Sequence, residues 1–407
     1  MNISLQPRIF LALLAAVGVL AMDPARANAA IQVSSNGVDS GLCGQGDAAP
    51  CATIGQAVAN AADGDAIVVG PGVYPGFSVV KTVSLYSGAG TGAAIINGPV
   101  TLAAAGVRFG KRGKGFSVTG STLSITGDDV AVRGNLFSNS ASACVDVTAG
   151  AGAVVRDNGF DNCVTGLAVS NGVAAEIRAN RFGHCSSAAV NLGVTSSGAI
   201  VRDNRISGIA GAGIFLGGSG HLLWRNLVHG MQIGVVVTTG VDIELDENEV
   251  VGSSGPGFQV TGGSGWVLRG NAASNNAAPG FVVSGVGEVV LEDNTAIGNM
   301  GYGFLFNSSA SGLVLEGNSA LQNSGEGLVL NAITTSVTVR GGNLYGNGGG
   351  NCGLVNASTS SVTTEDVYWG AAAPGPDPAD AICGNVPLVV VGSPASAPNT
   401  IRMPAIK

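Results

Sequence analysis

The chain repeats one pattern of hydrophobic and polar positions at intervals of 22 to 25 residues through its middle. Each repeat is marked by an asparagine: Asn135, Asn158, Asn180, Asn204, Asn226, Asn248, Asn271, Asn294, Asn318 and Asn343. The side chain three residues before the asparagine is apolar: Val132, Val155, Ile177, Val201, Leu223, Leu245, Leu268, Leu291 and Leu315. A repeat of this length, held over ten units, predicts a solenoid whose coils share one core.

Two further apolar positions occur in each repeat. One lies two residues after the asparagine: Phe137, Phe160, Phe182, Ile206, Val228, Val250, Ala273, Ala296, Ala320 and Tyr345. The other follows a glycine, as in Gly213-Ile214, Gly257-Phe258 and Gly327-Leu328. Short alternating segments separated by turn residues indicate strands, and no segment here has a useful helical period. The pattern therefore predicts an all-β parallel β-helix, a single chain wound with three short strands per 22–25-residue coil.

The asparagines are expected at a bend between strands. Asparagine tolerates the left-handed backbone conformation that such a bend needs. Because neighbouring strands lie about 4.8 Å apart, stacked amides can hydrogen-bond from coil to coil. Composition agrees with this fold, since 66 glycines, 45% hydrophobic residues and 11% charged residues suit buried strands joined by tight turns.

Residues 1–29 have the features of a signal peptide. Arg8 precedes an apolar stretch from Ile9 to Met22, and Ala27-Asn28-Ala29 offers a small-residue cleavage site. The organisation expected is residues 1–29 signal peptide, 30–110 cap and first coils, 111–351 regular coils, and 352–407 closing segment. This predicts export to the periplasm or the extracellular space, without membrane insertion.

The mature chain is acidic. Removing Arg8, Arg26 and Asp23 takes the formal charge from -8 to -9. This balance gives no electrostatic case for nucleic acid as a partner.

Seven cysteines fit an oxidising destination. Cys43 and Cys51 bracket a short loop, and Cys352 and Cys383 bracket the closing segment, so each pair is expected to form a disulfide. Cys163 and Cys185 each lie five residues after a ladder asparagine. They should stack on neighbouring coils and pair, which leaves Cys144 as a free, core-directed thiol. The cysteine spacing matches no common zinc pattern, and we expect neither metal nor cofactor.

The ends of the chain carry a resemblance to a known family. The stretch from Ile31 to Tyr74 resembles the N-terminal cap of secreted right-handed parallel β-helix proteins of the pectin-lyase-like superfamily, with a helix from about Thr53, its N-cap, to Ala62. The segment from Asn351 to Cys383 resembles the closing segment of such proteins. The resemblance implies fold and handedness. Its members include pectate and alginate lyases, polygalacturonases and mannuronan epimerases as well as adhesins and phage tailspikes, so it does not choose an activity.

Catalytic residues are not evident. The mature chain has four lysines, Lys81, Lys111, Lys114 and Lys407, none in the regular ladder. The segment Asp377-Pro378-Ala379-Asp380 is similar to the Asp-Pro-His-Asp motif of alginate epimerases but lacks the histidine, so it is interpreted as a structural turn. His184, His221 and His229 are expected to be structural or surface residues. The catalytic residues stay unknown.

Two columns of residues are expected to point outward from the solenoid. Strands that follow the glycines should present a mostly apolar stripe: Ala168, Asn191, Phe215, Val236, Gln259, Val282, Leu305 and Val329. This stripe is expected either to form a homo-oligomer or to lie under loops. Two residues before the asparagines, Arg133, Arg156, Arg178, Arg202, Trp224, Asp246 and Arg269 should stack in one column, with Glu244 beside it. Arginine forks bind carboxylates and sulfates, so this column is the candidate ligand site, with a solvated edge as the alternative.

Three function classes follow from the sequence. The first is a non-catalytic exported protein that binds carbohydrate, with acidic polysaccharide as the possible partner, or another surface partner. The second is a polysaccharide lyase, hydrolase or epimerase acting on uronic-acid polymers. The third is a structural or adhesive oligomer.

Overall fold

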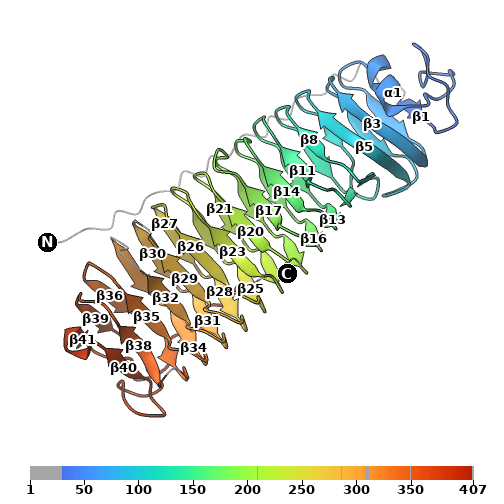
Figure 1. The fold of residues 1–407 in the computed structure, drawn as a ribbon. Coiled ribbons are helices and arrows are strands. Elements are labelled where there is room, and N and C mark those ends of the chain that lie inside the picture. Colours follow the sequence, from blue (N-terminus) through green and yellow to red (C-terminus); the bar gives the residue numbers. More distant parts are fainter. Residues whose placement is uncertain (1–29, 209, 286, 308–311, 349, 406–407) are drawn as a thin grey trace.

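Three parallel β-sheet faces wind around one apolar core over the whole length of the described chain. The computed structural model describes residues 30–208, 210–285, 287–307, 312–348 and 350–405. The predicted signal peptide, residues 1–29, lies outside the described residues. Strands of successive coils pair in parallel, and the coils stack into a long solenoid (Figure 1). This confirms the predicted parallel β-helix.

Face A is a 16-stranded parallel sheet. Its strands are β1 (Ile31–Val33), β2 (Ala66–Val69), β4 (Ser84–Ser87), β6 (Arg108–Phe109), β9 (Ala131–Arg133), β12 (Val154–Arg156), β15 (Glu176–Arg178), β18 (Ile200–Arg202), β21 (Leu222–Trp224), β24 (Glu244–Asp246), β27 (Trp266–Arg269), β30 (Val289–Glu292), β33 (Leu313–Glu316), β36 (Val337–Arg340), β39 (Val362–Glu365) and β41 (Val389–Val391).

Face B begins directly after the asparagine corner of each coil. Its strands are β7 (Ser117–Thr119), β10 (Leu136–Ser138), β13 (Gly159–Asp161), β16 (Arg181–Gly183), β19 (Arg205–Ser207), β22 (Leu227–His229), β25 (Glu249–Val251), β28 (Ala272–Ser274), β31 (Thr295–Ile297), β34 (Ser319–Leu321) and β37 (Leu344–Tyr345).

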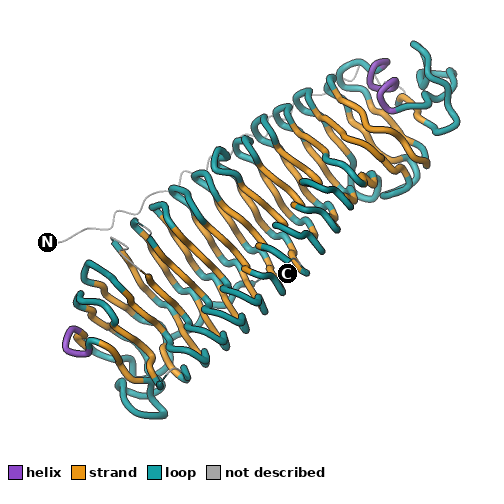
Figure 2. Tube along the Cα trace, viewed as in Figure 1, coloured by secondary structure: helices purple, strands orange, loops and turns teal. Residues whose placement is uncertain are grey.

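Face C completes each coil. Its strands are β8 (Leu123–Ile125), β11 (Ala143–Val147), β14 (Thr165–Val169), β17 (Ala188–Leu192), β20 (Ala212–Leu216), β23 (Ile233–Val237), β26 (Phe258–Thr261), β29 (Phe281–Ser284), β32 (Phe304–Asn307), β35 (Leu328–Asn331), β38 (Cys352–Asn356) and β40 (Ala381–Gly384). The longer strands β3 (Gly72–Val79) and β5 (Ala94–Leu102) run through both face B and face C in the first coils, since β5 pairs with β7 and with β8. Figure 2 shows how little of the described chain is helical.

The three predicted apolar columns point into the core. Every member of the column before the asparagines is at most 2% exposed, from Val132 to Leu315. In the second column the prediction fails at one place: Leu344 rather than Tyr345 pairs with Ala320 and points inward. The last repeat is longer, and the corner at Gly341-Gly342 shifts the strand by one residue, so Tyr345 turns outward and packs edge-on against Tyr368.

From Asn135 to Asn318 the asparagines form the predicted ladder inside the corner between faces A and B. The prediction is wrong for Asn343: Gly342 stands in register with Asn318, and Nδ2 of Asn343 donates to Oγ of Ser319 at 2.9 Å and to the carbonyl of Asn399 at 3.1 Å. The backbone N–H of Asn248 donates to Oδ1 of Asn271 at 3.0 Å, and Nδ2 of Asn271 donates to the carbonyl of Leu245 at 2.8 Å. The expectation that the asparagines themselves are left-handed is wrong. The preceding residue takes that conformation, as at Asp157 (φ 56°) and Ala179 (φ 54°). The bend is made one residue earlier, and the asparagine instead turns its amide inward to satisfy the polar groups of the bend.

A second asparagine ladder lines the corner between faces B and C. Asn276, Asn299, Asn323 and Asn347 are all buried and bond to one another through the same amide pattern. Asp380 ends this ladder: its carboxylate accepts from Nδ2 of Asn347 at 2.9 Å and from the N–H of Gly346 at 2.8 Å. Asp380 therefore has a structural role at the end of this ladder.

The open N-terminal end of the core is covered by the helix α1 (Ile54–Asn60). Thr53 is its N-cap, as predicted, because its Oγ1 accepts from the N–H of Gln56 at 3.2 Å. Asp39 supports this cap by accepting from the N–H groups of Ala52 and Thr53.

The C-terminal segment folds back along face B after the 3-10 turn η1 (Val386–Leu388). Asn399 exchanges hydrogen bonds with Asn343 next to β37, and the carbonyl of Arg402 accepts from Thr295 in β31. Outward-facing Thr295 and Ser319 are 2% and 1% exposed. An extended stretch of chain thus lies along the solenoid axis on this face, over small side chains.

Three disulfides are present. Cys43–Cys51 and Cys352–Cys383 confirm two predictions, but the third is Cys144–Cys163, with 5.8 Å between the Cα atoms. The predicted Cys163–Cys185 pair is wrong, and Cys185 rather than Cys144 is the free thiol. In-register side chains on neighbouring coils run side by side about 4.8 Å apart, farther than the 3.5–4.5 Å that usually separates the Cβ atoms of a disulfide.

The position of Cys144 explains its partner. It replaces a glycine of the column that includes Gly257, and a Cβ added at Gly257 would lie 3.0 Å from Nδ2 of Asn276, the corner side chain of the next coil. A side chain in this column therefore points at the next corner. For Cys144 that corner residue is Cys163.

Thiol counting tests this pairing. The unfolded, unreduced protein should contain one cysteine thiol that reacts with a thiol reagent, and Cys185→Ser should reduce the number of reactive thiols to zero. In the folded protein the thiol should react very slowly, because Cys185 is 1% exposed and burial raises its pKa to about 11. Three thiols in the unfolded wild type would show that Cys144 and Cys163 are not paired.

Candidate functional site

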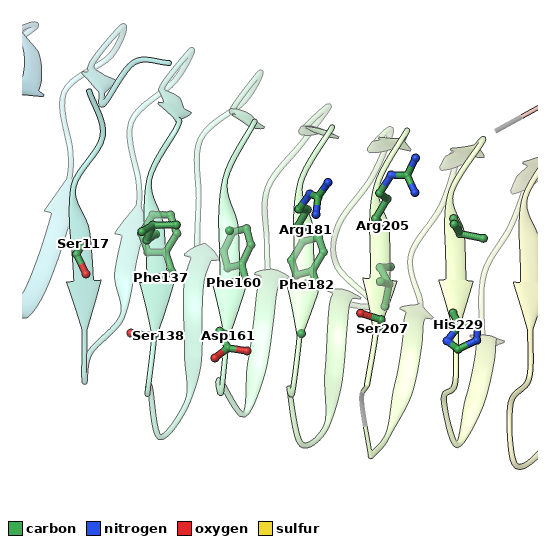
Figure 3. A pocket seen from close by; sticks show the side chains of 15 residues that line it. Ser117, Phe137, Ser138, Phe160, Asp161, Arg181, Phe182, Arg205, Ser207 and His229 are labelled. Carbon is green, nitrogen blue, oxygen red and sulfur yellow. The ribbon is translucent and has the colours of Figure 1, made fainter. Parts of the chain in front are cut away.

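An open groove of about 590 Å³ crosses face B between β7 and β22 (Figure 3). It follows the solenoid axis because consecutive coils each contribute one strand. Its lining residues are Ser117, Leu136, Phe137, Ser138, Gly159, Phe160, Asp161, Arg181, Phe182, Gly183, Arg205, Ile206, Ser207, Leu227 and His229. The groove is thus defined by outward residues of face B above buried phenylalanine rings.

Two exposed arginines, Arg181 and Arg205, stand on one side of the groove. They are direct partners in the pairing of β16 and β19, so their Cα atoms are about 4.8 Å apart. Among the described residues, neither guanidinium has a hydrogen bond or an ion pair. Two unpaired like charges on adjacent strands repel, and an anion between them removes that cost.

The other side of the groove carries Asp161, Ser207 and His229 (Figure 3). Oδ1 of Asp161 lies 2.7 Å from Nδ1 of His184, a residue at the left-handed corner that follows β16. Both side chains are largely exposed, at 64% and 76%. This side therefore offers hydroxyl, carboxylate and imidazole groups to a ligand.

The residues of the predicted ligand column on face A are aligned in the structure. Strand pairing aligns its predicted members one per coil, in the order Arg133, Arg156, Arg178, Arg202, Trp224, Asp246 and Arg269. The ion pairs of these side chains determine how much positive charge the column can offer to a ligand.

Most of the column's arginines already have carboxylate partners. Glu176 lies between Arg178 and Arg202, at 3.0 and 2.7 Å. Arg269 contacts Glu244 at 3.3 Å and Glu292 at 2.8 Å, and Nε of Arg133 contacts Asp157 at 2.7 Å. Arg156 alone among these arginines has no ion pair with a described residue. The middle of the column is a chain of half-exposed ion pairs, which resembles the solvated edge more than an open anion site.

Trp224 and Asp246 continue the column without forming a pocket. The guanidinium of Arg225 lies 5.1 Å from the indole centroid, so part of the ring face is already covered. Burial, and then the nearby Glu247 and Glu244 carboxylates, raise the pKa of Asp246.

His221 has a structural place. It is 1% exposed, and its Nδ1 accepts from the N–H of Ala199 at 3.0 Å. Burial lowers its pKa, which favours the neutral ring required for that bond. Among the described residues, one group of side chains is close enough together to hold a metal ion: Asp39, Cys43 and Cys51. This group belongs to the N-terminal cap, where the two cysteines form a disulfide.

The predicted apolar stripe on face C is aligned coil by coil from Ala168 to Val329. Val236 and Val329 are each 8% exposed, whereas Phe215, Val282 and Leu305 are half-buried. Self-association through this stripe stays a prediction.

Sequence reasoning missed the groove on face B. It followed the columns on faces A and C, and interpreted His184 and His229 only as structural or surface residues. His229 in fact lies within β22 and lines the groove, while His184 lies at a corner. A signal was present, because Arg181 and Arg205 each directly follow a ladder asparagine.

Comparisons with known proteins agree on the fold. The sequence model described as a right-handed beta helix region matches residues 72–228 and 223–367. No curated protein sequence matches the chain. Within the described residues, no helix is both long and apolar enough to cross a bilayer.

Solved structures with this fold differ in what they do. The AlgE4 A-module, a mannuronan C-5 epimerase of Azotobacter vinelandii, is 13% identical over 90% of this chain and 100% of its own, with a TM-score of 0.53. PfbA, a surface adhesin of Streptococcus pneumoniae, is 10% identical over 83% of this chain and 91% of its own, also at 0.53. The periplasmic alginate epimerase AlgG is 14% identical over 75% of this chain and 76% of its own, at 0.49. The likenesses to the AlgE4 A-module and to PfbA establish a shared fold, and the family match over more than half of the sequence shows that the chain belongs to the right-handed β-helix family.

Proposed function

We propose that this is an exported protein that binds a linear acidic polysaccharide in the groove of face B. The observation that carries the proposal is the unpaired Arg181–Arg205 pair, directed at a groove that runs along the solenoid axis. Three disulfides are consistent with export to an oxidising compartment, and one protein that shares this fold, PfbA, is a surface adhesin.

The charge of the protein makes this pair unusual. The chain has a net charge of -8, and the arginines of face A in the same coils, Arg178 and Arg202, have carboxylate partners: both contact Glu176, and Arg202 also contacts Asp203. Arg181 and Arg205 have no such partner among the described residues. The fork of a guanidinium binds a carboxylate or a sulfate through two parallel hydrogen bonds, so repeating acidic groups on a polymer match repeating arginines on a rigid scaffold.

The shape of face B also favours a linear ligand. Farther along the same face, the C-terminal segment lies in extended form over β34 and β31, where Thr295 donates to the carbonyl of Arg402. The face thus already accommodates one extended polymer along the axis. The groove between β7 and β22 offers a comparable path, with Ser138, Asp161 and Ser207 placed to bond sugar hydroxyls.

An enzyme acting on uronic-acid polymers is the second candidate. It is favoured by the Asp161–His184 contact of 2.7 Å at the groove, since a carboxylate-oriented imidazole can serve as a general base. Release of unsaturated uronates, or a change in the uronate composition of the polymer, would support this candidate, and His184→Gln should then remove that activity.

Binding to polyuronates and sulfated glycans tests the first proposal. Arg181→Ser with Arg205→Ser should weaken binding at least tenfold, and binding by the wild type should weaken steeply with salt, because exposed charges are screened over about 8–10 Å near physiological ionic strength. The matched control is Arg178→Ser with Arg202→Ser, in the same coils but on face A, which should change affinity little. Loss of binding in the control alone would assign the ligand to the face A column. Absence of binding to any acidic glycan would refute the proposal.

A further inference from the structure

A second pocket, of about 280 Å³, lies at the N-terminal end of face A. It is lined by Ser84, Leu85, Tyr86, Arg108, Gly110, Lys111, Ala131, Arg133 and Arg156. It is separate from the groove, because its lining comes from β4, β6, β9 and β12 and the turn that follows β6, whereas the groove lies on face B.

The pocket lies at a gap in the outward column of face A. In the outward column of face A, Gly110 lies between Tyr86 of the preceding coil and Arg133 of the next. Gly110 has φ 77°, and a Cβ there would lie only 2.8 Å from Cγ of Asn135 in the buried ladder. The position therefore requires glycine, and the gap in the column is a fixed part of the fold.

The walls of the gap are strongly basic. Arg108, Lys111 and Arg156 have no ion pair among the described residues, and Arg133 uses its Nε for Asp157. Burial, followed by repulsion from Arg133 and Arg178, lowers the pKa of Arg156. Nζ of Lys111 lies 3.4 Å from the ring centroid of Tyr86, which holds the ammonium at the pocket. Four cations thus surround a small cavity that contributes no carboxylate of its own.

We propose that this pocket binds one compact oxyanion group, a carboxylate, sulfate or phosphate, independently of the groove on face B. The volume suits a single such group rather than a polymer segment. The four cations provide the hydrogen-bond donors, and Tyr86 forms an apolar wall. The anion is either a free inorganic ion or the acidic group of a glycan, since both present the same chemistry to arginine forks.

Titration of the full chain with inorganic sulfate, inorganic phosphate and a glucuronate oligosaccharide tests the proposal. Calorimetry and the melting temperature provide two readouts, with sodium chloride at matched ionic strength as the background. The wild type should show saturable binding and a rise in melting temperature that follows ligand occupancy. Arg108→Ser with Arg156→Ser should weaken binding at least tenfold, and Arg108→Ser alone, at an exposed position, should weaken it in part.

The controls separate this site from the groove. Arg181→Ser with Arg205→Ser should leave oxyanion binding at the pocket unchanged, and so should Arg340→Ser, which removes a face A charge far along the solenoid. Binding of sulfate or phosphate shows that free ions occupy the pocket. Binding of the oligosaccharide alone, lost in the Arg108 and Arg156 variant, shows that the group is carried on a glycan. No saturable binding, or equal binding by that variant and the wild type, would overturn the proposal.

Discussion

Replacing Asn271 with alanine should lower the free energy of unfolding by about 3 kcal/mol or more. The side chain accepts from the backbone N–H and from Nδ2 of Asn248, both at 3.0 Å, and its own Nδ2 donates to the carbonyl of Leu245 at 2.8 Å. All of these groups are buried where water does not replace the lost partner. Each orphaned donor or acceptor costs about 1–3 kcal/mol, so the loss of one amide affects two coils at once.

A second asparagine stack supplies the matched control. Nδ2 of Asn331 donates to Oδ1 of Asn307 at 3.2 Å, but this pair is exposed on face C. Asn331→Ala should change stability by less than about 0.5 kcal/mol, since water takes over the bonds. Urea unfolding, followed through the fluorescence of the buried Trp266 and Trp369, measures both variants. Similar losses of unfolding free energy in the two variants would mean that burial does not determine how much a stacked asparagine contributes to stability.

The ladder was predictable from the sequence because stacked asparagines must recur once in every coil. A buried amide that bonds to the next coil needs another amide there, so the residue recurs once per turn. The second ladder, with Asn276, Asn299 and Asn323, carried the same signal five residues later and was overlooked. It starts only in the C-terminal half, and earlier coils hold Cys163, Cys185 and Met231 at that corner.

The wrong prediction of a Cys163–Cys185 disulfide has a different origin. Sequence spacing shows which residues share a column, but it does not show how far apart the sulfur atoms lie. Cys163 and Cys185 do share a column, whereas bonding requires side chains that approach from different columns. The interruption of the glycine column by Cys144 was readable, and its meaning became clear only from the close contact between that column and the next corner.

The charges of face A show that a column of residues cannot be interpreted without the columns beside it. Arg178 and Arg202 align as predicted, yet both contact Glu176 from the neighbouring outward column, and Arg202 also contacts Asp203. A residue's charge partners come from the adjacent column and the adjacent coil together. The same reasoning identifies where charge is left over: Arg181 and Arg205 on face B, and the Arg108–Arg156 region around Gly110.

Introducing valine at Gly280 should prevent the solenoid from folding properly. This glycine lies between faces B and C, where a Cβ would lie 2.9 Å from each of three atoms: Cβ of Ala296, Nδ2 of Asn299 and the carbonyl oxygen of Gly303. Two of these atoms belong to the core and to the second ladder, so neither can move without breaking buried contacts. Valine adds two methyl groups to the clash, and the expected destabilisation is about 3 kcal/mol or more.

The control is Gly375→Val, because a Cβ at Gly375 meets nothing within 4 Å. This variant should express, unfold and bind ligands as the wild type does. Ala189 holds a methyl group in the same column as Gly280, so alanine is too mild a test, and valine is needed. Gly280→Val should appear as insoluble protein or as a large fall in the urea midpoint. A Gly280→Val protein as stable as Gly375→Val would show that the corner between faces B and C tolerates side chains, and steric exclusion would then no longer explain why glycine recurs in this column.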